Sequence, residues 1–290
     1  MDLPLMIEAR KEIEIYFDKL GVDYSGKDTR QILVDYFSLK HKLISNSKRT
    51  VLSAKHLQEK VNTLGLKEIF DEILKKIAKG RDLNPHLSKG VLKPSKHDFI
   101  LNEWKLHHLH LTNLKKNESD YFFVRGDFLL FMHVQDYQIY LIDIIPHSDR
   151  LVFAKKDFIR IVKENWSDLH DKFLFGDGEM QLLDDLSEED IANYRRQPFG
   201  VLMVTQVDNQ TYMPGLGSTT SGHSLEAMRN MDGFHRQLWD IQNQLIEKDE
   251  FLKKSIKKKK GLTLNKLHFT VKLENGLFRI FEKNSKSYIA

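Results

Sequence analysis

Two runs of β-branched and aromatic residues near the middle of the chain constrain its fold most. Phe128–Val134 and Ile139–Ile145 are each long enough for one strand, and Gln135–Gln138 between them suits a hairpin turn. Trp104–Leu111 and Tyr121–Val124 have the same strand-like composition and come shortly before them. The sequence therefore predicts an antiparallel sheet built from neighbouring segments.

Helical spacing is found on both sides of this predicted sheet. Before it, Ala9–Leu20 and Leu66–Lys79 repeat apolar side chains as amphipathic helices do, and Ser53 is expected to start another helix. After it, Asp157–Leu169 returns to the same spacing, and a long helix is expected over residues 224–260.

Shorter signals divide the rest of the chain. The acidic stretch around residues 184–190 marks a boundary before a strand candidate, Gly200–Val207, and Asn275-Gly276 lies between alternating strands as in a hairpin. The fold class predicted is α+β, in three regions. These are a helical N-terminal region (residues 1–96), a central antiparallel sheet with a flanking helix (97–176), and a C-terminal α+β region with a glycine-rich loop, a long helix and a hairpin (177–290).

Composition limits where in the cell such a protein is expected. The 290 residues include no cysteine, which excludes disulfides, thiolate zinc sites and a cysteine nucleophile. No apolar run reaches the roughly 18 residues that a membrane span needs, and the first residues lack the order of a signal peptide. We therefore expect a cytoplasmic protein with no membrane partner.

Charge points weakly to a polyanionic partner. The 45 basic and 41 acidic residues leave a net charge of +4, so clustering matters more than the total. The densest cluster is Lys253–Lys260, in which Lys257 and Lys258 are candidates for contact with a phosphate backbone. The alternative is a solvated helix end, where cations favour the negative end of the helix dipole.

Three histidines within four residues form the first candidate site. In the predicted strand His108 and His110 share one face, while His107 points to the other. Two imidazoles on one face can act as a general acid and base, or they can bind a metal ion together with His147 or Asp143.

The segment from Arg125 to His147 is the second candidate site. It combines an Arg-Gly-Asp sequence, an apolar strand, a hairpin, and a second apolar strand ending near a histidine. This order, within roughly residues 104–150, resembles the RelE/ParE-like toxin ribonucleases of the barnase-EndoU-colicin-RelE type. The resemblance implies RNA cleavage without metal or cofactor, in which Arg125 clamps a phosphate and Tyr140 or His147 acts as acid or base. It also implies a neutralising protein partner and a toxin–antitoxin role in growth arrest or phage defence.

A glycine-rich loop is the third candidate. Gly215, Gly217, Ser221, Gly222 and His223 lie between a predicted strand and a predicted helix, where backbone N–H groups can bind an anion. The loop lacks the Walker and dinucleotide-binding spacings. It is predicted either to bind substrate phosphate or to be a simple connection capped by Ser224.

Two His-x-Thr triplets are the fourth candidate. His110-Leu-Thr112 and His268-Phe-Thr270, each on a predicted strand, resemble the paired motifs of the 2H phosphoesterases. That resemblance implies one acid and one base, with the threonine hydroxyls binding phosphate.

The sequence thus leaves three classes of function open. The leading hypothesis is an RNA-cleaving hydrolase with His108, His110, Arg125, Tyr140 and His147 at its catalytic site. The alternatives are a metal-dependent or 2H-type phosphoesterase, and a non-catalytic module that binds nucleic acid or a protein partner.

Overall fold

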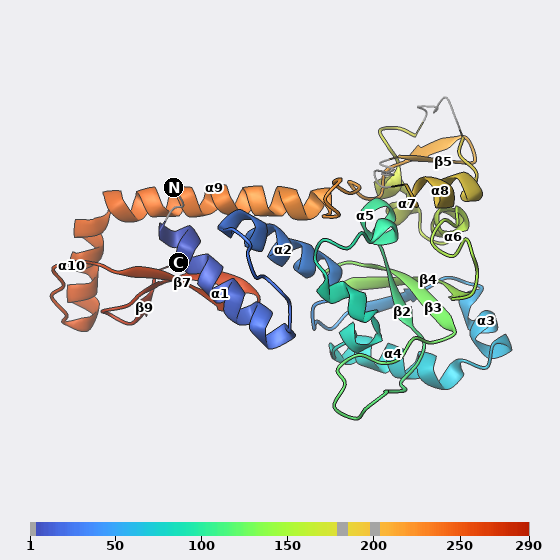
Figure 1. Ribbon diagram of the computed structural model, residues 1–290, viewed down its shortest axis with the longest axis horizontal. Helices are drawn as coiled ribbons and strands as arrows, with labels where there is room; N and C mark the ends of the chain where they lie inside the picture. Colours follow the sequence, from blue (N-terminus) through green and yellow to red (C-terminus); the bar gives the residue numbers. More distant parts are fainter. Residues whose placement is uncertain (1–3, 179–184, 198–203, 290) are drawn as a thin grey trace. The chain divides into compact units, whose positions relative to one another are not determined.

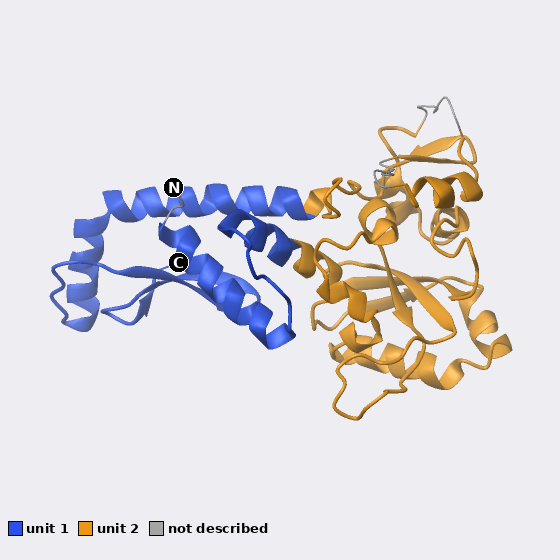
Figure 2. Ribbon diagram, viewed as in Figure 1, with its two compact units in different colours: residues 1–37, 227–290 blue, residues 38–226 orange. Residues whose placement is uncertain are grey.

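The computed structural model divides the protein into two compact units (Figure 2). We call residues 38–226 the central unit and residues 1–37 with 227–290 the terminal unit. The structure is described for residues 4–178, 185–197 and 204–289. This division differs from the three predicted regions, because the two ends of the chain fold together and residues 38–96 belong with the predicted sheet.

The central unit is built around a four-stranded sheet with strand order β1-β4-β3-β2 (Figure 1). The pairs β2–β3 and β3–β4 are antiparallel, as predicted, whereas β1 runs parallel to β4. This unit includes the last part of α2, from Ser38 on. The bounds of its elements are α2 (Thr29–Lys42), β1 (Thr50–Ser53), α3 (Leu57–Thr63), α4 (Lys67–Lys79), η1 (Asn84–His86), η2 (Lys89–Leu92), α5 (Phe99–Trp104), β2 (Leu106–His110), β3 (Phe128–Val134), β4 (Gln138–Pro146), α6 (Asp157–Asn165), α7 (Ser167–Phe173), α8 (Glu188–Tyr194), β5 (Thr205–Val207) and β6 (Gln210–Tyr212).

Side chains alternate across this sheet, so each face has its own core. One face, which includes Leu106 and Phe131, packs against α5, α6, α7 and α8. The other, which includes Leu109 and Met132, packs against α3 and α4. Strands that are buried on both faces are continuously apolar, which is why β3 and β4 are the clearest strand signals in the sequence.

Several predicted elements differ from the observed ones. Ser53 ends β1 instead of starting a helix. Tyr121–Val124 is not a strand, because its backbone bonds to residues outside the sheet: Phe123 N–H donates to the Pro85 carbonyl and Val124 N–H to the Leu114 carbonyl. Of the predicted strand Gly200–Val207, residues 200–203 lie outside the described part of the chain, as does Asp184 of the predicted boundary.

The predicted helix at 157–169 is interrupted. Trp166 has an extended backbone (φ −145°, ψ 90°), which ends α6 and lets α7 begin in a new direction. The β5–β6 hairpin turns through Asp208 and Asn209, both of which have positive φ. Asx residues tolerate this conformation, so this tight turn has a local chemical cause.

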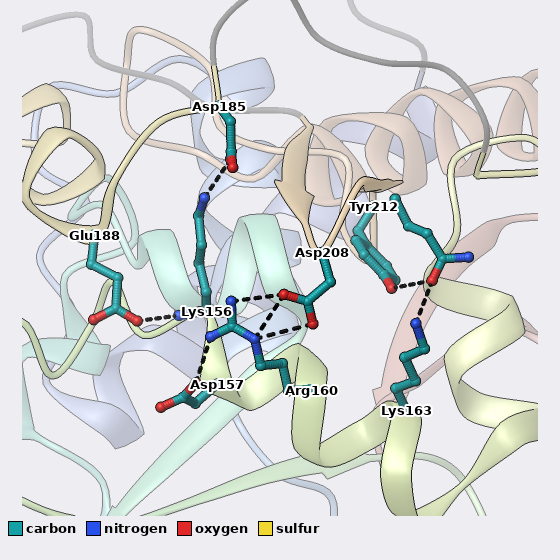
Figure 3. A network of polar contacts seen from close by, with 9 residues as sticks. Lys156, Asp157, Arg160, Lys163, Asp185, Glu188, Asp208 and Tyr212 are labelled. Atoms are coloured by element: carbon teal, nitrogen blue, oxygen red, sulfur yellow. Dashed lines mark hydrogen bonds and ion pairs between the residues drawn. The ribbon is translucent and has the colours of Figure 1, made fainter.

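An ion pair joins the β5–β6 hairpin to α6, and further polar contacts join Lys156, just before α6, to Asp185 and Glu188 (Figure 3). The Arg160 guanidinium contacts both carboxylate oxygens of Asp208 at 3.0–3.1 Å, and Lys156 Nζ lies 2.5 Å from Asp185 Oδ1. The backbone N–H of Lys156 also donates to Glu188 at the start of α8. Exposed pairs contribute little each, so their main effect is to fix the orientation of these elements.

The terminal unit pairs the two ends of the chain. The Glu8 carboxylate in α1 accepts a hydrogen bond from Thr270 in β7, and the Glu12 carboxylate pairs with Lys272 at 3.0 Å. Asn275 and Gly276 both have positive φ in the β7–β8 turn, which confirms the predicted hairpin. Besides α2 up to Phe37, its elements are α1 (Pro4–Leu20), α9 (Leu225–Glu247), α10 (Asp249–Lys260), β7 (Phe269–Glu274), β8 (Leu277–Glu282) and β9 (Ser287–Tyr288).

Lys248, with φ −97° and ψ 12°, divides the predicted helix of residues 224–260 into α9 and α10. Among the described residues, no helix is both long and apolar enough to cross a bilayer.

Candidate functional site

A cavity of about 480 Å³ lies in the central unit, at one end of the sheet. The register explains its position. His110 at the end of β2 pairs with Leu129 at the start of β3, which in turn pairs with Ile145 at the end of β4. The loops that carry Arg125 and His147 therefore reach the same end of the sheet as His110, and all three residues line the cavity.

The imidazoles in this cavity lie close to one another. The ring centroids of His110 and His147 are 5.4 Å apart, and those of His108 and His110 are 6.5 Å apart. His107 points to the other face of the sheet, as predicted. It still lines the cavity because β2 is the edge strand.

Unpartnered ring nitrogens show that this site is poorly satisfied by the protein itself. His110 is 3% exposed, and its Nδ1 has no hydrogen-bond partner among the described residues. Both ring nitrogens of His107 and Nδ1 of His97 are also buried without a hydrogen-bond partner among the described residues. Buried polar atoms are normally paired, so a cavity that gathers several unpaired ones is suited to a polar ligand.

Burial controls the protonation of the histidines. Burial, together with the smaller electrostatic effect of the neighbouring imidazoles of His108 and His147, lowers the pKa of His110 to about 4. The pKa of His108 is also lowered, chiefly by burial, although the Asp98 carboxylate opposes the shift. At neutral pH His110 is therefore an uncharged imidazole that can accept a proton.

The cavity lining is strongly cationic. It contains one carboxylate, Asp98, and six basic side chains. These are Lys42, Lys96, Arg125, Arg150, Arg195 and Arg196.

Four of these basic side chains differ in whether the protein itself already binds them. The ammonium of Lys42 donates to three backbone carbonyls and holds the wall of residues 93–96. Arg195 forms a buried ion pair with Glu103. Arg125 and Arg150 are exposed, and neither makes a hydrogen bond or ion pair with another described residue. These two guanidinium groups are therefore available to an anion.

Tyr140 lies away from this group of residues, which corrects its predicted place beside His147. It is near the start of β4, whereas His147 follows the strand's end, so roughly 20 Å of extended chain separates them. Its ring packs against Trp166 at 5.2 Å, and its hydroxyl donates to Gln138. Tyr140 is part of the core and does not line the cavity.

The glycine-rich loop packs on α5. The N–H groups of Gly215 and Gly217 donate to the carbonyls of Glu103 and Asn102, and Gly222 N–H donates to Thr219. These three amides are therefore occupied, and the loop contributes none of the cavity lining among the described residues.

The two remaining loop candidates also have local partners. The Ser221 hydroxyl bonds to Thr219, and His223 Nδ1 lies 2.8 Å from the Ser38 hydroxyl. The arrangement favours the simple-connection alternative over phosphate binding, and the Ser224 hydroxyl accepts from Glu226 N–H at the start of α9.

The predicted metal ligand Asp143 is committed elsewhere. Its carboxylate pairs with Lys60 at 2.7 Å and with His56 at 3.1 Å, beside α3. Within residues 4–178, 185–197 and 204–289, no three His, Asp or Glu side chains are grouped as a metal-binding set.

Three further candidates belong to the terminal unit. Lys257 and Lys258 are exposed on α10, and His268 is exposed just before β7. Thr270, the partner of His268 in the second His-x-Thr triplet, is buried and its hydroxyl donates to Glu8. That hydroxyl is thus already used, so the contacts do not favour the 2H-type interpretation.

Several lining residues carry no recognisable sequence signal. Arg150, Phe153 and His97 come from loops, and their neighbours have no periodic pattern. The adjacent pair Arg195-Arg196 is the one visible hint, since two arginines in an otherwise acidic stretch suggest an anion contact.

No known protein family, curated protein or solved structure matches this chain.

Proposed function

We propose that the protein is a metal-independent endoribonuclease, the activity that the resemblance to RelE/ParE-like toxins implies. The observation that supports it most is the convergence of His110, His147 and Arg125 on one cationic cavity. An endoribonuclease needs a base, an acid and a cation around one phosphate, and these three side chains have the right chemistry.

Each residue has a role in the proposed reaction. Neutral His110 takes the proton of a ribose 2′-hydroxyl, whose oxygen attacks the adjacent phosphorus. The bond from phosphorus to the 5′-oxygen breaks, and the His147 imidazole, as the general acid, donates a proton to that leaving oxygen. Arg125 and Arg150 stabilise the charge on the non-bridging oxygens. The products are a 2′,3′-cyclic phosphate and a 5′-hydroxyl. The proposed step therefore consumes no water and assigns no role to a metal ion.

Replacement of Arg125 or His147 by alanine tests this mechanism. Loss of a cation at the phosphate is expected to lower kcat by roughly 10²- to 10³-fold, and loss of the acid by roughly 10²- to 10⁴-fold. Cleavage of a single-stranded RNA is followed in EDTA, and the termini of the products are identified. The matched control is Arg81→Ala, since Arg81 is exposed and is not part of the cavity lining.

The folded state of each variant is checked by circular dichroism. Full cleavage by folded Arg125→Ala and His147→Ala proteins would end the proposal. An RNA that is 2′-O-methylated at every position should bind but remain uncut. If it is cut, the 2′-hydroxyl is not the nucleophile.

Binding without cleavage by the wild-type protein would favour the non-catalytic alternative. In a cell, the toxin interpretation predicts that expression of the wild-type chain arrests growth and that His147→Ala does not.

A further inference from the structure

An aromatic ring is held at the cavity surface by a rigid turn. Phe153 is 38% exposed and lines the cavity, although its neighbours Val152 and Ala154 are buried. Val152 N–H donates to the Asp149 carbonyl, and Ala154 N–H to the Leu151 carbonyl. The backbone is therefore fixed on both sides of a side chain that stays open to solvent.

The ring is also supported from behind. The His108 ring meets it edge-on with centroids 5.2 Å apart, and Phe131 from the buried core meets it at 6.2 Å. The Arg195 guanidinium donates to the Phe153 carbonyl. These contacts place a preorganised apolar surface next to the imidazoles and cations of the cavity.

We propose that Phe153 is a stacking platform for a nucleobase next to the phosphate held by Arg125. A planar base is the ligand group that suits an exposed aromatic ring in a cationic cavity, since both its stacking and its phosphate are then accommodated. Phe153 has no polar atom to read a base edge, so the platform is indifferent to sequence. A base can stack there only when it is not paired, which makes single-stranded RNA the substrate class.

This inference rests on the proposed function for its choice of ligand, but binding alone tests it. The probe is a short single-stranded RNA, 2′-O-methylated throughout and containing 2-aminopurine, which cannot be cleaved by the proposed route. Its affinity for the full chain is measured by fluorescence. Phe153→Ala is expected to bind roughly 5- to 150-fold more weakly, as for loss of one base–aromatic stack.

Two further variants separate stacking from packing. Phe153→Leu keeps apolar bulk without an aromatic face and should bind as weakly as Phe153→Ala, whereas Phe153→Trp should retain affinity. The matched control is Tyr137→Ala, because Tyr137 is 83% exposed at the β3–β4 turn, outside the cavity lining.

The outcomes are distinct. Unchanged affinity in Phe153→Ala, or equal affinity of the wild-type protein for a duplex of the same sequence, overturns the platform. If the wild-type protein never cleaves RNA but Phe153→Ala loses affinity, the platform stands and the nuclease proposal fails. If cleavage is robust and Phe153→Ala binds normally, the nuclease proposal stands without the platform.

Discussion

His86 is a buried histidine that supports the backbone of His110, a residue of the cavity lining. It is fully buried, and the Lys76 ammonium donates to its Nε2 at 2.8 Å. Its Nδ1 must then carry the proton, and it donates to the His110 carbonyl at 3.3 Å. Burial and the adjacent Lys76 charge lower the pKa of His86 to about 4, so the folded protein keeps it neutral.

The stability of the protein should therefore depend on pH in the acid range. Since the pKa of His86 is near 4 when folded and about 6.5 when unfolded, its contribution is complete above about pH 6.5 and is lost as the pH falls towards 4. At pH 5 the loss from this residue is on the order of 2 kcal/mol. The measurement is the free energy of unfolding in urea near pH 7 and pH 5, for the wild type and for His86→Leu.

The variant should be less stable than the wild type near pH 7, because Lys76 and the His110 carbonyl lose their partner. It should lose less stability on acidification. Equal losses in the two proteins would show that protonation of His86 is not what weakens the fold in acid.

At the scale of elements, the sequence predicts hairpins better than helix ends. Strands β3 and β8 follow the predicted runs because buried apolar runs and an Asn-Gly turn are local signals. Strand β1 is four residues long and is held by pairing with β4, which is distant in sequence. The breaks at Trp166 and Lys248 fall at residues that are not typical helix breakers, so no local signal in the sequence marks them.

The glycines of the glycine-rich loop are explained by close backbone packing rather than by ligand binding. A Cβ atom on Gly222, which has φ +91°, would lie 1.8 Å from the Ser95 carbonyl oxygen. A Cβ atom on Gly215 would lie 2.0 Å from the carbonyl oxygen of Asn102. Glycine is needed at both positions because two backbones meet there.

Gly222→Ala and Gly215→Ala are accordingly expected to destabilise the central unit by roughly 1–3 kcal/mol or more, since backbone must move to make room. The fluorescence of Trp104, which is buried in this unit, follows its unfolding in urea. The matched control is Gly233→Ala in α9, where a Cβ atom meets nothing within 4 Å. There alanine should stabilise the terminal unit by about 0.5–1 kcal/mol. A fully stable Gly222→Ala protein would contradict the close approach.

For the molecule as a whole, the site was partly visible in the sequence. The sequence singles out His108 and His110 as a histidine cluster and Arg125 and His147 through the resemblance, and the antiparallel register brings all four to the same end of the sheet. Tyr140, which the resemblance places at the site, lies near the start of β4 and outside the cavity lining. Residues such as Phe153 join the cavity lining through tertiary packing, which no local sequence pattern encodes.

The division into units yields a final prediction. The central unit is one continuous stretch, residues 38–226, and each residue that lines the cavity belongs to it. A fragment of these residues should therefore fold and bind single-stranded RNA.

The same fragment tests the lysine run. If Lys257 and Lys258 contact the phosphate backbone, the plot of log K against log salt concentration should be steeper for the full chain than for the fragment. The expected difference in slope is about 1.4, or about 0.7 for each neutralised phosphate. The comparison uses one uncleavable RNA titrated at several salt concentrations. Equal slopes would show that the lysines do not contact phosphate and only form a solvated helix end. An unfolded fragment would show that the central unit needs the terminal unit in order to fold.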